Sequence, residues 1–508
     1  METKTKLSSK WIYKFYEELD KHSVENHGLI MMRDGEVLFE NYVYPYSADV
    51  PHTMFSVTKS IVSTAAGFAI DEGLFNLDTK IIDLFPEYPA CESDEWDSLT
   101  VRSVLTMQSN KEFSFTQDMT GNYVEMFMKA PFRKKNRGFL YSNNDAHMVA
   151  AIVQKCAKMN LVDYLTPRLF EPLGIERPFW EFNELGENIG GTGCHMKLRD
   201  LAKLSQCYAD GGKWNGEQII PEFWAREATK LQVKHDNGKD SGYGYLFWIF
   251  DDIFSMDGMF GQRVSYLPKH NAVIASFNAC VNDGDFTKAF DNILPKAFEE
   301  EADEEWDKKL ADYLALKGEK PVACDKLPEI PTGRKFCLTP VSDILAKLMF
   351  PASLIPRSLT SSFAQRPKSN LNEVSFDVTE NVFTVMWKEE GDEVKIHCGL
   401  DGAPRLSECE IKGYRYTIWA YAYISRGKLT VVVKPLNTLA TQKITFEFSE
   451  NEVMLRFVGT PSFPAFISKN ADQSSFVKNS GALKPAIMKV IDKVLKTTEM
   501  PMKFKAKI

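Results

Sequence analysis

Apolar and polar residues in the first 75 positions follow two different periods. Between residues 11 and 21 apolar side chains recur every three or four positions, which predicts an amphipathic helix. Residues 29–40 have the pattern of two strands joined at Asp34-Gly35, a dipeptide typical of a tight hairpin turn. Helical spacing returns from residue 56 onward, and Gly73 is well placed to end that helix.

Strand patterns reappear only after a long region that is mostly helical and rich in turns, which ends near residue 210. A second strand-rich block begins near Tyr243, and residues 256–279 are expected to form two strands joined at 268–271. Strands at both ends with helices between them predict one antiparallel sheet built from distant pieces of chain. The expected fold class is therefore α+β, with helices packed on that sheet.

A change in the sequence pattern after residue 315, from a helical to a proline-rich and then a strand-like pattern, predicts a domain boundary. Residues 298–312 are acidic and helical in pattern, and 321–333 are rich in proline and turn residues, so we expect a first domain over 1–315 and a linker over 316–334. Short alternating strands at 383–387, 393–396, 428–433 and 443–448 predict a small all-β domain over 335–475, a barrel or a curled sheet.

The last segment, residues 476–508, is basic and carries an apolar stripe at helical spacing. We interpret it as a terminal helix docked on its own protein. A helix that lies on a membrane surface or on a partner is the alternative.

Composition narrows the classes of function. The 508 residues carry a net charge of -8, which argues against nucleic acid as a partner. The start of the chain lacks the apolar core of a signal peptide, and no apolar run approaches a membrane span, so we expect a cytoplasmic protein with no membrane association. Nine scattered cysteines suggest reduced thiols, and eight dispersed histidines predict no metal site and no cofactor.

Ser56 and Lys59 are the first candidate catalytic pair. A spacing of three residues at the start of a helix puts the amine on the same face as the hydroxyl. A lysine buried beside a serine can act as its base, and the helix start offers free N–H groups where an oxyanion would form. The alternative is a serine that caps the helix, followed by a solvated lysine.

Two later stretches could complete such a site. Tyr141-Ser142-Asn143 would present a phenol for proton transfer and an amide to orient the substrate or the lysine; a buried tyrosine and a turn asparagine are the alternative. The glycine-rich stretch 257–264 leads into a strand whose edge could aim the Met259 N–H at a substrate carbonyl, opposite the Ser56 N–H. A bulge with no ligand is the alternative there.

In this order and spacing the three pieces resemble the serine β-lactamase and penicillin-recognising enzyme superfamily, and within it the class C-type branch of related serine hydrolases and esterases. The resemblance runs from about residue 29 to 280 and includes segments 54–60, 100–107, 141–143, 172–175, 190–204 and 258–262. It implies an antiparallel sheet of five to seven strands flanked by helices. It also implies that Ser56 is acylated, that Lys59 and Tyr141 transfer protons, that Asn143 orients substrate and lysine, and that the N–H groups of Ser56 and Met259 form the oxyanion hole.

One departure from the family pattern bears on the substrate. Members that act on β-lactams usually carry Lys-Thr-Gly or His-Thr-Gly on the third strand, and Met256-Asp257-Gly258 stands in the corresponding place. A substrate carboxylate should bind poorly beside this acidic residue unless Arg263 supplies the missing cation. We expect Gly258, Gln262, Arg263 and Trp248 to contact the substrate.

The function expected from these residues is hydrolysis of a small ester, amide or peptide-like molecule through a Ser56 acyl-enzyme. A β-lactamase or D-amino-acid peptidase is one alternative, and a non-catalytic binding protein on the same fold is another. The C-terminal domain resembles, more loosely, the lipocalin-like barrels appended to hydrolases of this branch. Oligomeric state, and transfer of the acyl group to an acceptor other than water, stay open.

Overall fold

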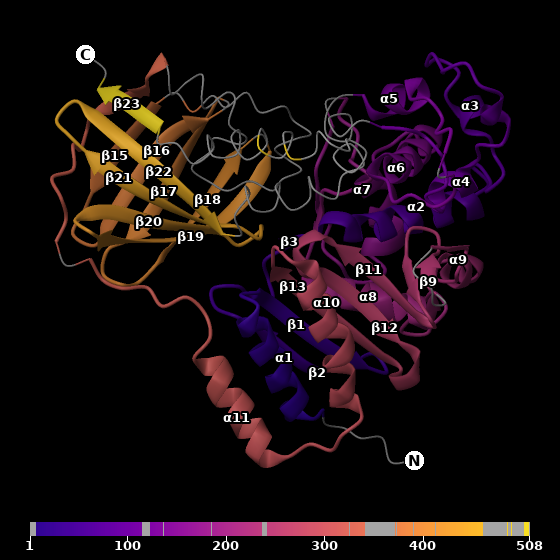
Figure 1. Ribbon diagram of the computed structural model, residues 1–508, viewed down its shortest axis with the longest axis horizontal. Coiled ribbons are helices and arrows are strands. Elements are labelled where there is room, and N and C mark those ends of the chain that lie inside the picture. Colours follow the sequence, from indigo (N-terminus) through magenta and orange to yellow (C-terminus); the bar gives the residue numbers. More distant parts are fainter. Residues whose placement is uncertain are drawn as a thin grey trace. The chain divides into compact units, whose positions relative to one another are not determined.

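The computed structural model describes residues 7–113, 122–135, 137–183, 185–235, 241–324, 326–340, 371, 373–389, 391–411, 413–460, 485, 489 and 502–506. The chain divides into two compact units, Met1–Lys317 and Gly318–Ile508 (Figure 1). Each unit has its own sheet.

The first unit is built on an antiparallel sheet of eight described strands, in the order β2-β1-β13-β12-β11-β10-β9-β8. Strand β1 (Glu25–Arg33) lies beside β13 (Ala272–Ala279), so the ends of a region about 250 residues long meet in one sheet, as predicted. The resemblance implied at most seven strands. The two-residue β8 (Val233–Lys234) and the three-residue β9 (Ser241–Tyr243) extend one edge to eight.

Both predicted turns of this sheet are confirmed. Between β1 and β2 (Glu36–Tyr42), Asp34 and Gly35 have φ angles of 52° and 79°, the left-handed pair that a two-residue hairpin requires. Strand β12 (Gln262–Leu267) reaches β13 through a short turn at Pro268–His270, and Asn271 leaves that turn with a φ of 43°. Asparagine tolerates this conformation better than most residues do.

Helices cover both faces of the sheet. Helices α1 (Ser9–Lys21) and α10 (Asp283–Asn292) pack on one face, with Leu29 and Met31 of β1 in their core. Helices α8 (Leu198–Ala209), α2 (Thr58–Asp71) and α6 (Asn143–Ala157) form the core on the other face, which receives Ile30 and Met32. Successive residues of a strand point to opposite faces, so β1 is buried along nearly its whole length and apolar from Gly28 to Met32.

Apart from α11, which has 12 residues, the remaining described α-helices and strands of this unit are short. They are α3 (Ile81–Leu84), α4 (Val101–Leu105), α5 (Tyr123–Lys129), α7 (Leu161–Leu165), α9 (Glu222–Ala228), α11 (Glu304–Ala315), β3 (His52–Thr53), β4 (Phe179–Trp180), β5 (Cys194–Met196), β6 (Lys213–Trp214), β7 (Glu217–Gln218), β10 (Trp248–Phe250) and β11 (Ile253–Gly258). The acidic helix predicted from residue 298 begins only at Glu304. The Asp303 side chain caps it there by accepting the Glu305 N–H.

The second unit is a β-barrel. Its described strands are β14 (Lys335–Leu338), β15 (Glu373–Val378), β16 (Val382–Glu389), β17 (Asp392–Gly399), β18 (Arg405–Ile411), β19 (Tyr414–Ser425), β20 (Lys428–Pro435), β21 (Thr441–Phe448), β22 (Glu452–Thr460) and β23 (Met502–Ala506). The sheet closes where β17 pairs with β19, so nine of these strands form the ring and β18 lies outside it. The four strands predicted from alternation all lie in this ring.

The end of the chain differs from the predicted terminal helix. Residues 502–506 form strand β23, which pairs with β14 on one side and with β22 on the other. Pro485 and Lys489 are helical, as predicted, whereas the residues of the apolar stripe (487, 488, 491, 494 and 495) lie outside the described residues. Met502 and Phe504 are buried. They are two positions apart in β23, so both side chains point to the core face of the sheet.

Two expectations from composition can be compared with this fold. All nine cysteines are free thiols. Within the described ranges, no helix combines the length and the apolar character needed to span a bilayer.

Candidate active site

Ser56 sits on a tight turn at the start of the most buried helix of the first unit. Residues Phe55–Val57 form a 3₁₀ turn, and the α-helix α2 follows from Thr58. Phe55 adopts a φ of 48°, a conformation that is costly for a bulky residue. The Phe55 ring packs against Phe260 at 5.2 Å, and this contact helps to hold the turn. The helix therefore starts two residues later than predicted, and the three-residue spacing still puts Ser56 and Lys59 on one face.

Lys59 is almost completely buried, with 1% of its surface exposed. Its Nζ donates hydrogen bonds to Ser56 Oγ at 2.8 Å, to Asn143 Oδ1 at 2.7 Å and to the Gly191 carbonyl at 2.6 Å. The alternative of a capping serine followed by a solvated lysine does not fit this geometry. Instead, the lysine amine joins the serine hydroxyl to two segments that follow much later in the chain.

Asn143 and Gly191 come from neighbouring parts of the helical region. Asn143 is the first residue of α6, whose start is capped by Ser142 Oγ accepting the Asp145 N–H. The Gly190-Gly191 pair passes close to this helix, because a Cβ on Gly190 would lie 2.6 Å from the Ala146 carbonyl oxygen. The contact between the Gly191 carbonyl and Lys59 was not predicted from the sequence. The adjacent glycines are the signal that could have found it, since they mark a close approach of two backbones.

Tyr141 completes the group around Ser56. Its ring lies 4.9 Å from Lys59 Nζ. Burial raises the pKa of the Tyr141 phenol above its usual value, and a hydrogen bond with Ser56 opposes this shift. Hydroxyl, amine and phenol therefore meet at one place, although they lie 85 positions apart in the sequence.

Trp248 forms a wall beside this group. Its indole stacks on the Tyr141 ring, with ring centroids 5.3 Å apart and planes inclined by 20°. Tyr243 meets both rings edge-on, at 6.2 Å from Tyr141 and 5.0 Å from Trp248. Trp248 is half-buried. Because it stacks on Tyr141, this predicted substrate contact lies next to the reacting groups.

The third predicted piece lies against the turn that carries Ser56. Strand β10 pairs with β11 only from Ile253 to Ser255, so among the described strands none pairs with the last residues of β11 on that edge. There Gly258 touches the turn: a Cβ on it would lie 2.3 Å from the Met54 carbonyl oxygen and 3.2 Å from the Ser56 nitrogen. Met259 follows immediately. Its backbone nitrogen is bonded to Gly258 and therefore lies near the turn that carries Ser56, where the predicted oxyanion hole would form.

Gln262 does not point toward this region. Its side chain is fully buried, donates to the Phe260 and Asn278 carbonyls at 3.1 and 2.6 Å, and accepts the Asn278 N–H at 3.3 Å. It braces the turn after Gly258 against strand β13. The prediction that Gln262 contacts the substrate is therefore corrected to a role inside the protein.

Arg263 is also turned away, on the face of the sheet that α10 covers. It forms ion pairs with Asp257 at 3.3 Å and with Asp291 at 3.2 Å, and only 4% of its side chain is exposed. Its charge is thus neutralised within the protein, and Arg263 is not available to a substrate carboxylate. Arg263 does not make the expected substrate contact, because alternation along β12 directs its side chain to the face of the sheet that α10 covers.

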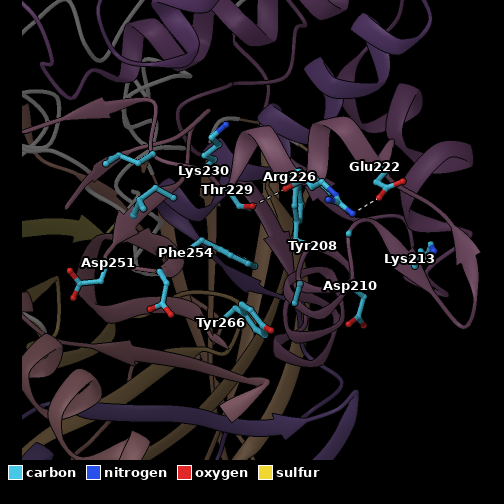
Figure 2. Close-up of a pocket in the computed structure, with 16 residues that line it drawn as sticks. Tyr208, Asp210, Lys213, Glu222, Arg226, Thr229, Lys230, Asp251, Phe254 and Tyr266 are labelled. Carbon is cyan, nitrogen blue, oxygen red and sulfur yellow. Dashed lines mark hydrogen bonds and ion pairs between the residues drawn. The ribbon is translucent and has the colours of Figure 1, made fainter. Parts of the chain in front are cut away.

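A hollow lies away from Ser56 on the first unit. It has a volume of about 750 Å³ and is lined by parts of α8, α9 and strands β10 to β12, with Phe254 and Tyr266 in its wall (Figure 2). None of the predicted catalytic residues lines it. Nor do the described residues contain a group of three or more His, Cys, Asp or Glu side chains that could hold a metal ion.

Comparison with known proteins agrees with the fold of the first unit. The family model described as Beta-lactamase matches residues 14–318. The 6-aminohexanoate-dimer hydrolase of Paenarthrobacter ureafaciens is 24% identical over 283 residues, which are 49% of this chain and 71% of that protein. A solved structure described as "Putative 6-aminohexanoate-dimer hydrolase from Bacillus anthracis" shares the fold with a TM-score of 0.50 at 19% identity, over 56% of this chain and 81% of that one. The match of the family model to more than half of the sequence shows that the chain belongs to the β-lactamase family, as a β-lactamase-related serine hydrolase.

Proposed function

We propose that this protein cleaves a small ester or amide through an acyl-enzyme formed on Ser56. The observation that carries the proposal is the position of the Lys59 amine, 2.8 Å from Ser56 Oγ and buried from solvent. A candidate base must lie within hydrogen-bond reach of the proton that it removes, and this amine does.

The first step is attack on the substrate carbonyl. Ser56 Oγ forms a bond to the carbonyl carbon while its proton passes to the neutral Lys59 amine, which in this state has two N–H groups for Asn143 and the Gly191 carbonyl and a lone pair for the Ser56 hydroxyl. Asn143 and the Gly191 carbonyl hold the amine in place at 2.7 and 2.6 Å, so it keeps its direction toward Oγ. The N–H groups of Ser56 and Met259 would stabilise the negative charge that develops on the carbonyl oxygen.

The second step is departure of the alcohol or amine. Because burial raises the pKa of Tyr141, the phenol keeps its proton at neutral pH and can give it to the leaving group. Tyr141 recovers a proton from the protonated Lys59 amine. Water then attacks the acyl carbon and gives a proton to the restored base, the bond to Ser56 Oγ breaks, Oγ takes that proton back, and the acid leaves.

The surroundings of Ser56 favour an uncharged group next to the scissile bond. Tyr141, Trp248 and Tyr243 supply an aromatic wall, which suits an apolar acyl or leaving group. Beside β11, which carries Met256-Asp257-Gly258, Arg263 of β12 is already paired with Asp257 and Asp291. The relative that hydrolyses the 6-aminohexanoate dimer supports an amide as readily as an ester.

Labelling of the nucleophile tests this proposal directly. A fluorophosphonate probe should attach to Ser56 of the native protein, and peptide mass spectrometry should locate the adduct. Ser56→Ala and Lys59→Met should abolish or strongly slow labelling. Ser60→Ala is a matched control, because Ser60 lies one turn further along the same helix and donates to the Leu246 carbonyl instead.

The outcomes separate the candidate functions. Attachment at Ser56 together with turnover of p-nitrophenyl esters or anilides supports the hydrolase. Rapid, stable acylation by a fluorescent penicillin would favour the β-lactam-recognising alternative. No adduct on a folded protein would refute the mechanism and leave a non-catalytic binding protein.

A further inference from the structure

A second buried lysine lies outside the group around Ser56. Lys111 follows helix α4, and only 2% of its surface is exposed. Its Nζ lies 3.7 Å from the centre of the Trp96 ring and 3.8 Å from the centre of the Phe132 ring. It also donates a hydrogen bond to the Ala130 carbonyl at 2.8 Å. This amine is therefore held in one place by an aromatic cage and one carbonyl.

Cys91 is the other nucleophile at this place. Its Sγ lies 3.5 Å from Lys111 Nζ and donates to the same Ala130 carbonyl at 3.2 Å. The backbone of Cys91 is fixed on both sides, because its N–H donates to the Met128 carbonyl and its own carbonyl accepts the Trp96 indole N–H at 2.8 Å. Cys91 as a residue is only half-buried, so it is in contact with solvent that can carry a small oxidant.

We propose that Cys91 and Lys111 form a covalent sulfur–nitrogen cross-link when the protein meets a peroxide. The geometry carries the proposal: a reachable thiol and a buried amine are held side by side by one shared acceptor. A thiolate oxidises to a sulfenic acid, and a nearby nitrogen can trap that acid as a sulfenamide.

The chemistry balances in two steps. The Cys91 thiol and hydrogen peroxide give the sulfenic acid and one water, so sulfur is oxidised and peroxide is reduced. The neutral Lys111 amine then attacks this sulfur, the S–O bond breaks, and the hydroxyl leaves as a second water with a proton from nitrogen. Excess thiol reverses the link by attacking sulfur and releasing the amine.

The electrostatic environment supplies the neutral amine that the second step needs. Burial lowers the pKa of Lys111 to about 8, although the neighbouring Cys91 opposes this shift. About a tenth of the molecules therefore carry an uncharged amine at pH 7, and most do at pH 9.

Peptide mass spectrometry after treatment with hydrogen peroxide tests the proposal. The native protein should yield a joined pair of peptides, one with Cys91 and one with Lys111, lighter by two hydrogen atoms than the sum of the reduced peptides. Dithiothreitol should separate them. The yield should rise several-fold between pH 7 and pH 9, as the amine loses its proton.

Three controls make the result specific. Cys91→Ser should give no link. Lys111→Met keeps an apolar chain of similar length in the aromatic cage, and its Cys91 should then be labelled by dimedone, which captures sulfenic acids. Cys156 is a matched cysteine: it is half-buried and follows Lys155 in sequence, but the Lys155 amine is paired with Glu87 at 2.5 Å. It should oxidise without a link to lysine.

The proposal is overturned if peroxide converts Cys91 of the native protein to a dimedone-reactive or more highly oxidised form while Lys111 stays unmodified. It is equally overturned if the joined peptides appear only after unfolding, or if Cys156 and Lys155 become joined to the same extent.

Discussion

Replacement of Gly258 by alanine should disable the enzyme without unfolding it. The added methyl group would lie 2.3 Å from the carbonyl oxygen of Met54 and 3.2 Å from the nitrogen of Ser56. Both are backbone atoms of the turn that carries the nucleophile, so neither can turn aside as a flexible side chain would. Strand β11 and this turn must therefore move apart.

The size of the effect follows from this overlap. Relief of the contact with Met54 requires a displacement of roughly 1 Å, and a misplacement of that size can cost about 100-fold in rate. Loss of one oxyanion-hole donor costs a similar amount, about 3 kcal/mol in the activation free energy. We therefore expect kcat of Gly258→Ala to fall by about 100-fold, with a smaller change in KM.

Steady-state hydrolysis of a p-nitrophenyl ester, together with thermal unfolding, measures both consequences. Gly284→Ala is the matched control, because Gly284 lies in helix α10 and the nearest atom to an added Cβ is 3.5 Å away. That variant should keep its activity, and its melting temperature should stay the same or rise slightly, since alanine favours a helix. Wild-type kcat in Gly258→Ala would refute the proposed contact between the third strand and the nucleophile turn.

Three further predictions test other parts of the site and its support. Tyr141→Phe should lower kcat by about 100-fold or more while keeping the aromatic wall, whereas Tyr243→Phe should change kcat only a few-fold; equal effects would show that Tyr141 acts only by packing. Gln262→Leu leaves buried backbone groups without partners, so the free energy of unfolding in urea should fall by about 3 kcal/mol, and an unchanged midpoint would contradict its bracing role. Burial lowers the pKa of His147 to about 3, and only its neutral ring can accept the Gly190 N–H. Below about pH 6.5 the unfolded chain therefore binds a proton at this histidine that the folded chain does not. The free energy of unfolding should then drop by about 1.4 kcal/mol per pH unit as the pH falls below 6. His147→Gln should lose that component of the slope in pH-dependent urea unfolding, and identical slopes would refute it.

Local features were determined by the sequence alone. The turn at Asp34-Gly35 and the strands of the barrel depend on a few adjacent residues, because turn geometry and alternation act over short distances. The pairing of Ser56 with Lys59 is local in the same way, since one turn of helix sets their separation. These predictions hold even where the helix start was misplaced by two residues.

The tertiary structure alone decided which side chains face the reaction. Gln262 and Arg263 lie in a stretch that the sequence placed at the substrate, yet α10 and strand β13 cover the sides to which they point. The Gly191 carbonyl reaches Lys59 only because a loop 132 residues further on packs against α6. The strand at residues 502–506 likewise exists because β14 and β22 offer it hydrogen-bond partners. Local pattern specifies the elements, and only the pairing of distant segments specifies what each side chain touches, because burial and partners are properties of the packed molecule.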